Sequence, residues 1–282
     1  MFLNNAYCQC VWFLSVFQLG RYYVNPSTLN LQAVVQLSVD AGHAILPFYR
    51  TDFEVQSKAD DSPVTAADLA AHRCIAQGLQ HTGLQVVSEE GETRTEARSY
   101  WLVDPLDGTK SFINGQPDFT VNIALIVEGR PVWGVVHAPV TQQTWWGGPA
   151  EGSWVEDQQG TRRIACVEPQ QPLRVLASRN HLNDATQAFI AQLGPVDRVS
   201  RGSSLKFCAI AQGQADLFPR LGPCCEWDTA AGEAVLMGAG GSLCDLEGRP
   251  LRYGKADPLN PYFIASGQAD PRDYLPQGQD RQ

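Results

Sequence analysis

Residues 100–112 read YWLVDPLDGTKSF, and this stretch carries the strongest local signal in the sequence. Its apolar start predicts a buried strand, and the D-P and D-G pairs that follow predict a sharp turn. The turn brings the carboxylates of Asp104 and Asp107 toward one point, and the carbonyl of Leu106 lies between them. Oxygen donors of this kind are the ligands that Mg²⁺ prefers in proteins. We therefore predict a metal site at the end of this strand.

The same turn offers a second kind of contact. The backbone N–H groups of Gly108 and Thr109 open a short predicted helix and can hold a phosphate oxygen. Taken alone, D-P and D-G are ordinary turn dipeptides without a chemical role. Their position directly after an apolar strand, together with acids elsewhere in the chain, favours the metal site.

Two other segments supply further acids. The sequence VVSEEG at 86–91 ends a second apolar strand at Glu89, for which an exposed turn is the ordinary alternative. The sequence WDTAAG at 227–232 places Asp228 at the start of an Ala-rich helix, where capping is the ordinary alternative. A turn or a cap accounts for one acid at a time. All of these acids together predict a Mg²⁺ site.

Length and charge narrow the class of protein. With 282 residues, 44% of them hydrophobic, the chain can fill the core of one large domain or of two closely packed halves. The net charge of -9 argues against nucleic acid as a partner, because such a surface carries an excess of Lys and Arg. An acidic protein can still bind an anionic substrate through metal ions. We expect a small-molecule substrate, and the sequence gives no indication of a stable protein partner.

The cysteines and the N-terminal region indicate the compartment. The eight cysteines form no C-x-x-C pair and no regular framework, so we predict reduced thiols, with a redox role for Cys224 and Cys225 as the alternative. Residues 10–19, CVWFLSVFQL, are apolar but have about half the length of a membrane-spanning helix. No basic residue precedes them, so a signal peptide is not favoured. We expect a cytoplasmic protein, with peripheral association at the inner membrane left open.

Helices and strands can be placed along most of the chain. Apolar periodicity predicts a helix from Leu31 to Pro47, and a capping box of Thr65 and Asp68 predicts the start of a second. Strands are predicted at 84–87, 100–103, 119–127, 132–137 and 143–146, and then at 173–177, between 193 and 203, at 215–218 and at 261–265. Further helices are predicted at 183–193, 203–212 and 227–237. A seam near 164–172 divides the chain into an extension (1–28), an α+β half with the metal site (29–165) and an α/β half (166–282).

An ordered series of segments resembles the inositol monophosphatase superfamily of Mg²⁺-dependent, lithium-sensitive phosphatases. From about Leu31 to Ile264 the segments are KADDSPVTAAD, VSEEG, WLVDPLDGTK, FTVNIALI, GVVHAPV, SRNH, GSSLKFC and WDTAAG. The resemblance implies an α/β fold with the layered αβαβα order of sugar phosphatases. It also implies that the active site lies between the two halves. The DGTK and GSSLK stretches favour the bisphosphate nucleotidase branch of the superfamily.

The resemblance further implies roles for individual residues. The implied metal ligands are Glu89, Asp104, the Leu106 carbonyl, Asp107 and Asp228. Asp68 and Thr109 are the implied catalytic pair, in which the Thr109 hydroxyl passes a proton toward Asp68 and orients the attacking water. The implied substrate-binding residues are Glu89, Leu106, Asp107, Gly108, Thr109, His181, Ser203, Lys206, Arg220 and Asp228.

The expected reaction is hydrolysis of 3'-phosphoadenosine 5'-phosphate to AMP and phosphate, with the 5'-phosphosulfate analogue as a further expected substrate. Lys206 and Arg220 can supply the positive charge that a second phosphate demands. An inositol or other sugar phosphatase, the nearest alternative, would not need that charge. A catalytically silent nucleotide-binding protein is the alternative from another class. Departures from the branch pattern at Ser111 and at 224–226 remove no metal ligand.

Overall fold

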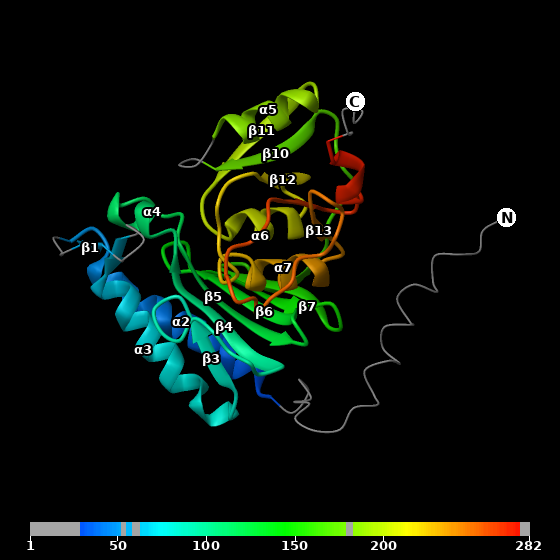
Figure 1. Cartoon of the computed structure of the whole chain (residues 1–282). Coiled ribbons are helices and arrows are strands. Elements are labelled where there is room, and N and C mark those ends of the chain that lie inside the picture. Colours follow the sequence, from blue (N-terminus) through cyan, green and yellow to red (C-terminus); the bar gives the residue numbers. More distant parts are fainter. Residues whose placement is uncertain (1–28, 52–54, 58–62, 179–182, 277–282) are drawn as a thin grey trace, which may run out of the picture.

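The computed structural model of the protein describes residues 29–51, 55–57, 63–178 and 183–276. Within this part of the chain, helices and sheets stack in the layered order αβαβα (Figure 1). The α/β fold class predicted from the resemblance is therefore confirmed. The extension at 1–28, with its apolar stretch, lies outside the described residues.

The first layer consists of α2 (Leu31–Ile45) and α3 (Ala66–Leu79), which pack side by side. The first helix ends at Ile45, two residues before the predicted boundary at Pro47, and a 3-10 turn at 46–48 follows it. Thr65 and Asp68 form the predicted capping box at the start of α3. The side chain of each residue accepts a hydrogen bond from the backbone N–H of the other, so the first turn of this helix is held firmly. That turn also carries the predicted catalytic carboxylate.

The second layer is a seven-stranded sheet in the order β3-β4-β5-β6-β7-β8-β9. Its strands are β3 (Gln85–Ser88), β4 (Ser99–Asp107), β5 (Thr120–Val127), β6 (Arg130–Ala138), β7 (Gln143–Gly148), β8 (Gly152–Asp157) and β9 (Gly160–Ile164). The first two strands run parallel, and the remaining neighbours are antiparallel. Parallel pairing places the carboxyl ends of β3 and β4 at the same edge of the sheet.

The third, fourth and fifth layers come from the C-terminal part of the chain. The helices are α6 (Leu205–Ala211) and α7 (Ala230–Gly238) between the sheets and α5 (Asp184–Gln192) outside them. The five-stranded sheet, in the order β11-β10-β12-β14-β13, contains β10 (Leu173–Ser178), β11 (Val196–Arg201), β12 (Leu217–Arg220), β13 (Ser242–Asp245) and β14 (Phe263–Ser266). Shorter elements are β1 (Val55–Ser57), β2 (Pro63–Thr65), α4 (Thr109–Ile113) and 3-10 turns at 80–82 and 271–274.

The large sheet is buried on both faces. Trp101 and Val103 of β4 belong to the core that α2 and α3 cover, whereas Tyr100 and Leu102 belong to the core that contains α6 and α7. Successive side chains of a strand point to opposite faces, so one strand serves both cores. This double burial explains why β4 reads as a continuous apolar run.

Five strands were not predicted, namely β1, β2, β8, β9 and β13. The sequences GSWVED and GTRRI of β8 and β9 contain glycine and charged residues, because these strands lie toward the open edge of the sheet. A second correction concerns the last helix, which was predicted to begin at Trp227. It begins at Ala230, and Thr229 is its N-terminal flanking residue. Asp228 therefore lies in the preceding loop and is not the helix cap.

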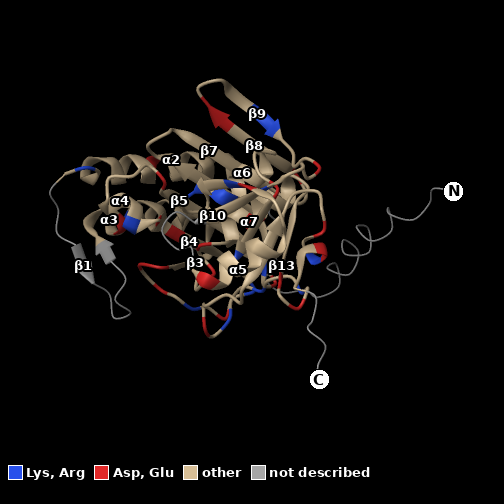
Figure 2. Ribbon diagram, turned by 90° about the horizontal axis from the view of Figure 1, so that it is seen from above, with Lys and Arg blue, Asp and Glu red and all other residues tan. Residues whose placement is uncertain are grey.

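Charged residues are distributed over the whole molecule. Viewed from above, short Lys or Arg segments and short Asp or Glu segments lie on several elements and loops (Figure 2). Among the described residues, no helix combines the length and the apolar character that crossing a membrane requires.

Candidate active site

Three of the predicted metal ligands meet at one point. One oxygen from each of Asp104, Asp107 and Asp228 lies within 4.8 Å of the other two. Asp104 is buried and the other two are half-buried. The first two come from the carboxyl end of β4 and the third from the loop before α7, so a contact between the two parts of the chain completes the cluster.

A bulge in β4 brings its two acids together. Asp104 pairs with Asn122 and Asp107 with Thr120, so four residues of β4 lie opposite three of β5. In a regular strand, residues three apart point to opposite faces, and the extra residue of the bulge corrects this. The Leu106 N–H donates to Oδ1 of Asp104 at 3.1 Å, which fixes the turn.

The chain leaves the turn through Gly108, whose φ is +96°. A Cβ at this position would lie 2.9 Å from the carbonyl oxygen of Asp118. Both the backbone conformation and the close approach require glycine.

Glu89 adjoins the cluster through the parallel pairing of β3 and β4. Ser88 pairs with Val103, and the Glu89 N–H donates to the Val103 carbonyl at 3.2 Å. The next position in this register is Glu89 beside Asp104. Glu89 also acts on Asp104 electrostatically, because its charge adds to the effect of burial in raising the pKa of Asp104.

The electrostatics of the cluster favour a bound cation. Burial, followed by the charges of Glu89 and Asp107, raises the pKa of Asp104 well above its usual range. Burial and the same two neighbours also raise the pKa of Asp228. Like charges held together in a poorly solvated site repel one another until a cation compensates them. The ligands are oxygens only, so the residues present fit Mg²⁺.

The predicted catalytic pair is also brought together. The Thr109 hydroxyl lies 3.4 Å from Oδ1 of Asp68 and 3.2 Å from the Leu106 carbonyl oxygen. The other carboxylate oxygen of Asp68 accepts from the N–H and the hydroxyl of Thr65, at 2.8 and 2.6 Å. The capping box thus fixes one oxygen of Asp68 and leaves the other facing Thr109.

Ser203 and Ser204 bind a metal-site carboxylate from the other part of the chain. Oδ2 of Asp107 accepts from the Ser203 hydroxyl at 2.6 Å, the Ser204 N–H at 2.7 Å and the Ser204 hydroxyl at 3.0 Å. Ser203 has a φ of +50°, which is uncommon for a residue other than glycine. These bonds orient Asp107 and leave its Oδ1 for the cluster.

Residues of β5 extend this contact. Asn122 donates to the Ser204 hydroxyl at 2.8 Å, and the Thr120 and Ser203 hydroxyls are hydrogen-bonded. Thr120, Asn122 and Ser204 were not predicted as site residues. A signal was present, since Thr120 and Asn122 are polar residues in a strand that is buried throughout.

The predicted phosphate-binding cations, Lys206 and Arg220, come from α6 and β12 in the C-terminal part of the chain. The Lys206 ammonium donates to the Ser203 carbonyl at 2.6 Å, and burial lowers the pKa of Lys206 to about 8. The Arg220 side chain donates to the Pro223 carbonyl, while its Nε is buried without a hydrogen-bond partner in the described part of the chain. His181 lies outside the described residues.

The residues that depart from the branch pattern have structural contacts. Ser111 is buried in α4. Cys224 and Cys225 are free thiols, and burial raises the pKa of each to about 12. Thiols of that kind are poor nucleophiles, which argues against the redox alternative.

Fold and site together define a phosphatase-type α/β protein with a cluster of carboxylates that could hold a metal ion. The inositol monophosphatase family model matches residues 29–275, and the chain belongs to this family. Mg²⁺ dependence is general in the family, and lithium sensitivity is typical of it.

The resemblance to the nucleotidase branch is also confirmed. The 3'(2'),5'-bisphosphate nucleotidase CysQ of Shigella flexneri is 46% identical over 245 residues, which are 84% of this chain and 99% of the relative. The protein of the same name from Buchnera aphidicola is 37% identical and covers 84% of this chain and 91% of its own length. The crystal structure of CysQ from Bacteroides thetaiotaomicron has a TM-score of 0.77 at 37% identity and covers 85% of this chain and 97% of its own.

Proposed function

We propose that this chain is a Mg²⁺-dependent 3'(2'),5'-bisphosphate nucleotidase that hydrolyses 3'-phosphoadenosine 5'-phosphate to AMP and phosphate. The observation that carries the proposal is the 46% identity to such nucleotidases across nearly their full length. The acidic cluster and the Asp68–Thr109 pair support it, because they provide a metal site and a proton-transfer group in the same place.

The proposed metal ligands are Glu89, Asp104, the Leu106 carbonyl, Asp107 and Asp228. A bound Mg²⁺ supplies a Lewis acid that polarises the phosphate ester and lowers the pKa of nearby water. The Thr109 hydroxyl orients the attacking water and passes a proton to Asp68. Since Thr65 occupies one oxygen of Asp68, the other remains as the acceptor.

Two rival functions make different predictions for a direct assay. Phosphate release is measured from the bisphosphate nucleotide and from inositol monophosphate, side by side. A nucleotidase prefers the first substrate, and an inositol phosphatase prefers the second. A silent binding protein releases phosphate from neither.

Activity should require Mg²⁺ and should be lost in excess chelator, because burial and mutual repulsion raise the pKa of Asp104 and of Asp228, and the charge of Arg220 offsets this only in part for Asp228. Ca²⁺ should suppress activity, since its longer and looser coordination displaces the reacting groups. Rates are measured with each ion alone and with both. Full activity in chelator would contradict the metal assignment.

Lithium should inhibit, as is typical of the family.

Arg220 tests the proposed binding of the uncleaved phosphate more directly than Lys206 does. Its Nε is a buried donor without a partner among the described residues, and a phosphate oxygen would satisfy it. Lys206 is less suitable, because its ammonium also holds the Ser203 turn that orients Asp107. The role of Lys206, Ser203 and His181 in binding the nucleotide remains part of the proposal.

Arg220→Met is expected to lower kcat/KM for the bisphosphate nucleotide by about 10- to 100-fold, equivalent to the ~1.5–3 kcal/mol of a hydrogen bond to a charged group. The loss for p-nitrophenyl phosphate should be much smaller, because this monoester has no second phosphate. Both values are measured at saturating Mg²⁺. Equal losses on the two substrates would show that Arg220 serves the cleaved phosphate or the fold.

A further inference from the structure

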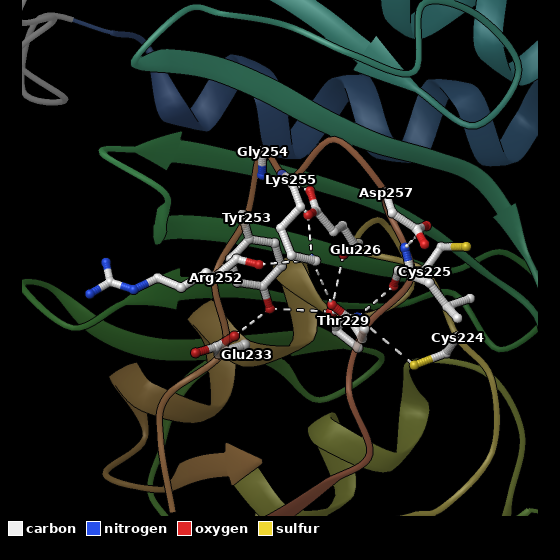
Figure 3. Close-up of polar contacts among 12 residues, drawn as sticks. Cys224, Cys225, Glu226, Thr229, Glu233, Arg252, Tyr253, Gly254, Lys255 and Asp257 are labelled. Carbon is white, nitrogen blue, oxygen red and sulfur yellow. Dashed lines mark hydrogen bonds and ion pairs between the residues drawn. The ribbon is translucent and has the colours of Figure 1, made fainter. Parts of the chain in front are cut away.

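Glu226 lies two residues before the metal-site acid Asp228 and is itself buried, with 4% of its surface exposed. Its carboxylate accepts from the Gly254 N–H at 2.7 Å and from the Lys255 N–H at 3.0 Å, and the Lys255 ammonium forms an ion pair with it (Figure 3). A buried carboxylate with a full set of donors is held in one orientation. Glu226 therefore fixes its own loop to the segment that carries Lys255.

The segment 252–260 also forms hydrogen bonds with the residues on either side of Asp228. The Lys255 ammonium donates to the Arg252 carbonyl at 2.9 Å and to Oδ1 of Asn260 at 3.3 Å. The Asn260 amide donates in turn to the Cys225 carbonyl at 2.8 Å and to the Thr229 hydroxyl at 3.0 Å. A continuous chain of hydrogen bonds thus runs from Lys255 to both flanks of the metal ligand.

One of those flanks orients the ligand directly. Oδ2 of Asp228 accepts from the Cys225 N–H at 2.8 Å, and the Asp228 N–H lies 3.2 Å from the Cys225 carbonyl. The direction of the carboxylate therefore depends on where the Cys225 peptide is held. The peptide that carries this N–H is held by the Asn260 N–H, which donates to the Cys224 carbonyl at 2.9 Å. The following peptide is held by the Asn260 side chain and by the anchoring of Glu226.

We propose that Glu226 and Lys255 are a pair of positioning residues that set the Asp228 carboxylate for metal binding. This proposal rests on the proposed function, which supplies the identity of the metal. It lies at a place where this chain departs from the branch pattern, so the resemblance does not supply it. Neither side chain belongs to the acidic cluster, and the pair acts through the Cys225 peptide.

The ion pair has a matched control elsewhere in the protein. Arg174 and Asp216 form another largely buried pair, with side chains 18% and 1% exposed, against 29% and 5% for Lys255 and Glu226. Asp216 also accepts backbone hydrogen bonds, from Arg174 and Gln170. This pair ties the start of β12 to β10, and the hydrogen bonds that it forms in the described part of the chain do not reach the acidic cluster. Its loss should affect stability alone.

The test compares Lys255→Met, Lys255→Arg and Arg174→Met with the wild-type chain. Calorimetric titration gives the Kd for Mg²⁺, thermal unfolding gives the Tm, and steady-state assays give kcat and KM. Lys255→Met should weaken Mg²⁺ binding about 10-fold, as expected when a group that orients a metal ligand is lost. Its kcat at saturating Mg²⁺ should stay close to wild type. Lys255→Arg, which keeps the charge, should restore Mg²⁺ binding.

Arg174→Met should lower the Tm and leave the Kd for Mg²⁺ unchanged. The proposal is overturned if Lys255→Met leaves that Kd unchanged, or if Arg174→Met shifts it by the same factor. If Lys255→Met does not fold, Lys255→Gln, which keeps a donor without the charge, takes its place under the same criterion. Wild-type hydrolysis of the bisphosphate is measured in the same series. Its absence alongside a normal Mg²⁺ titration would refute the proposed function but leave the pair standing.

Discussion

Asp107→Asn is expected to lower kcat by about 10³-fold or more, since a correctly placed metal supplies several kcal/mol of charge stabilisation in the transition state and each 1.36 kcal/mol is tenfold. The fold should survive. The amide oxygen can still accept the donors of Ser203 and Ser204, which bind one oxygen of Asp107. In that orientation the amide nitrogen replaces Oδ1 and faces the cluster, where it cannot bind a cation.

Turnover, Mg²⁺ affinity and the Tm in chelator together check this prediction. The Tm in chelator should not fall below the wild-type value, because the substitution removes one charge from a group of mutually repelling acids. Asp157→Asn is a matched carboxylate control, since Asp157 pairs with Arg162 on β8 and β9, away from the cluster. It should retain full activity. Near-native turnover of Asp107→Asn would exclude Asp107 as a metal ligand.

Thr109→Ala is expected to reduce kcat by about 10²- to 10⁴-fold, the range for a lost proton-transfer group. The hydroxyl is the only part of Thr109 placed to reach both Asp68 and the turn, at 3.4 and 3.2 Å. Mg²⁺ affinity should change little, because the substitution removes no carboxylate. Steady-state kinetics over a range of Mg²⁺ concentrations separates the two effects.

Thr109→Ser is the conservative partner of this variant. It keeps the hydroxyl and should recover most of the activity, whereas a purely steric role of the Thr109 methyl group would leave Ser as impaired as Ala. If excess Mg²⁺ restores Thr109→Ala, the hydroxyl supports metal binding and the proposed proton transfer is wrong.

The strands β4, β8 and β9 show where strand prediction from the sequence succeeds and where it fails. The run before Asp104 is apolar because β4 is covered on both faces, and this pattern is readable in the sequence alone. The residues of β8 and β9 form an edge region, so charged and apolar residues follow no strong pattern there. Their strand character comes from pairing with β7, which is a tertiary contact.

The outcome for Asp228 illustrates a different limit. The acid in WDTAAG was recognised, but its alternative role as a helix cap was local reasoning and is wrong, because α7 begins at Ala230. Its carboxylate is instead oriented by the Cys225 N–H. That bond depends on the segment 252–260, about thirty residues further along the chain. Local sequence carries no information about such a partner.

The sequence by itself determined the features that short-range physics controls. Apolar periodicity, the Thr65–Asp68 capping box and the turn around Asp107 each follow from residues within a few positions of one another. The acids that can bind a metal were identified in the same way, through the strands and turns that present them. The family resemblance, carried by ordered motifs, supplied the fold class and the reaction.

Only the tertiary structure decided how these acids are oriented. The bulge in β4, the hydrogen bonds from Ser203 and Ser204 to Asp107, and the Glu226–Lys255 pair all join segments that are distant in sequence or shift their register. Charges of one sign can be held together only if other groups fix their directions, and those groups come from whichever strand or loop packs alongside. Packing, and not local pattern, therefore determines the geometry of the site.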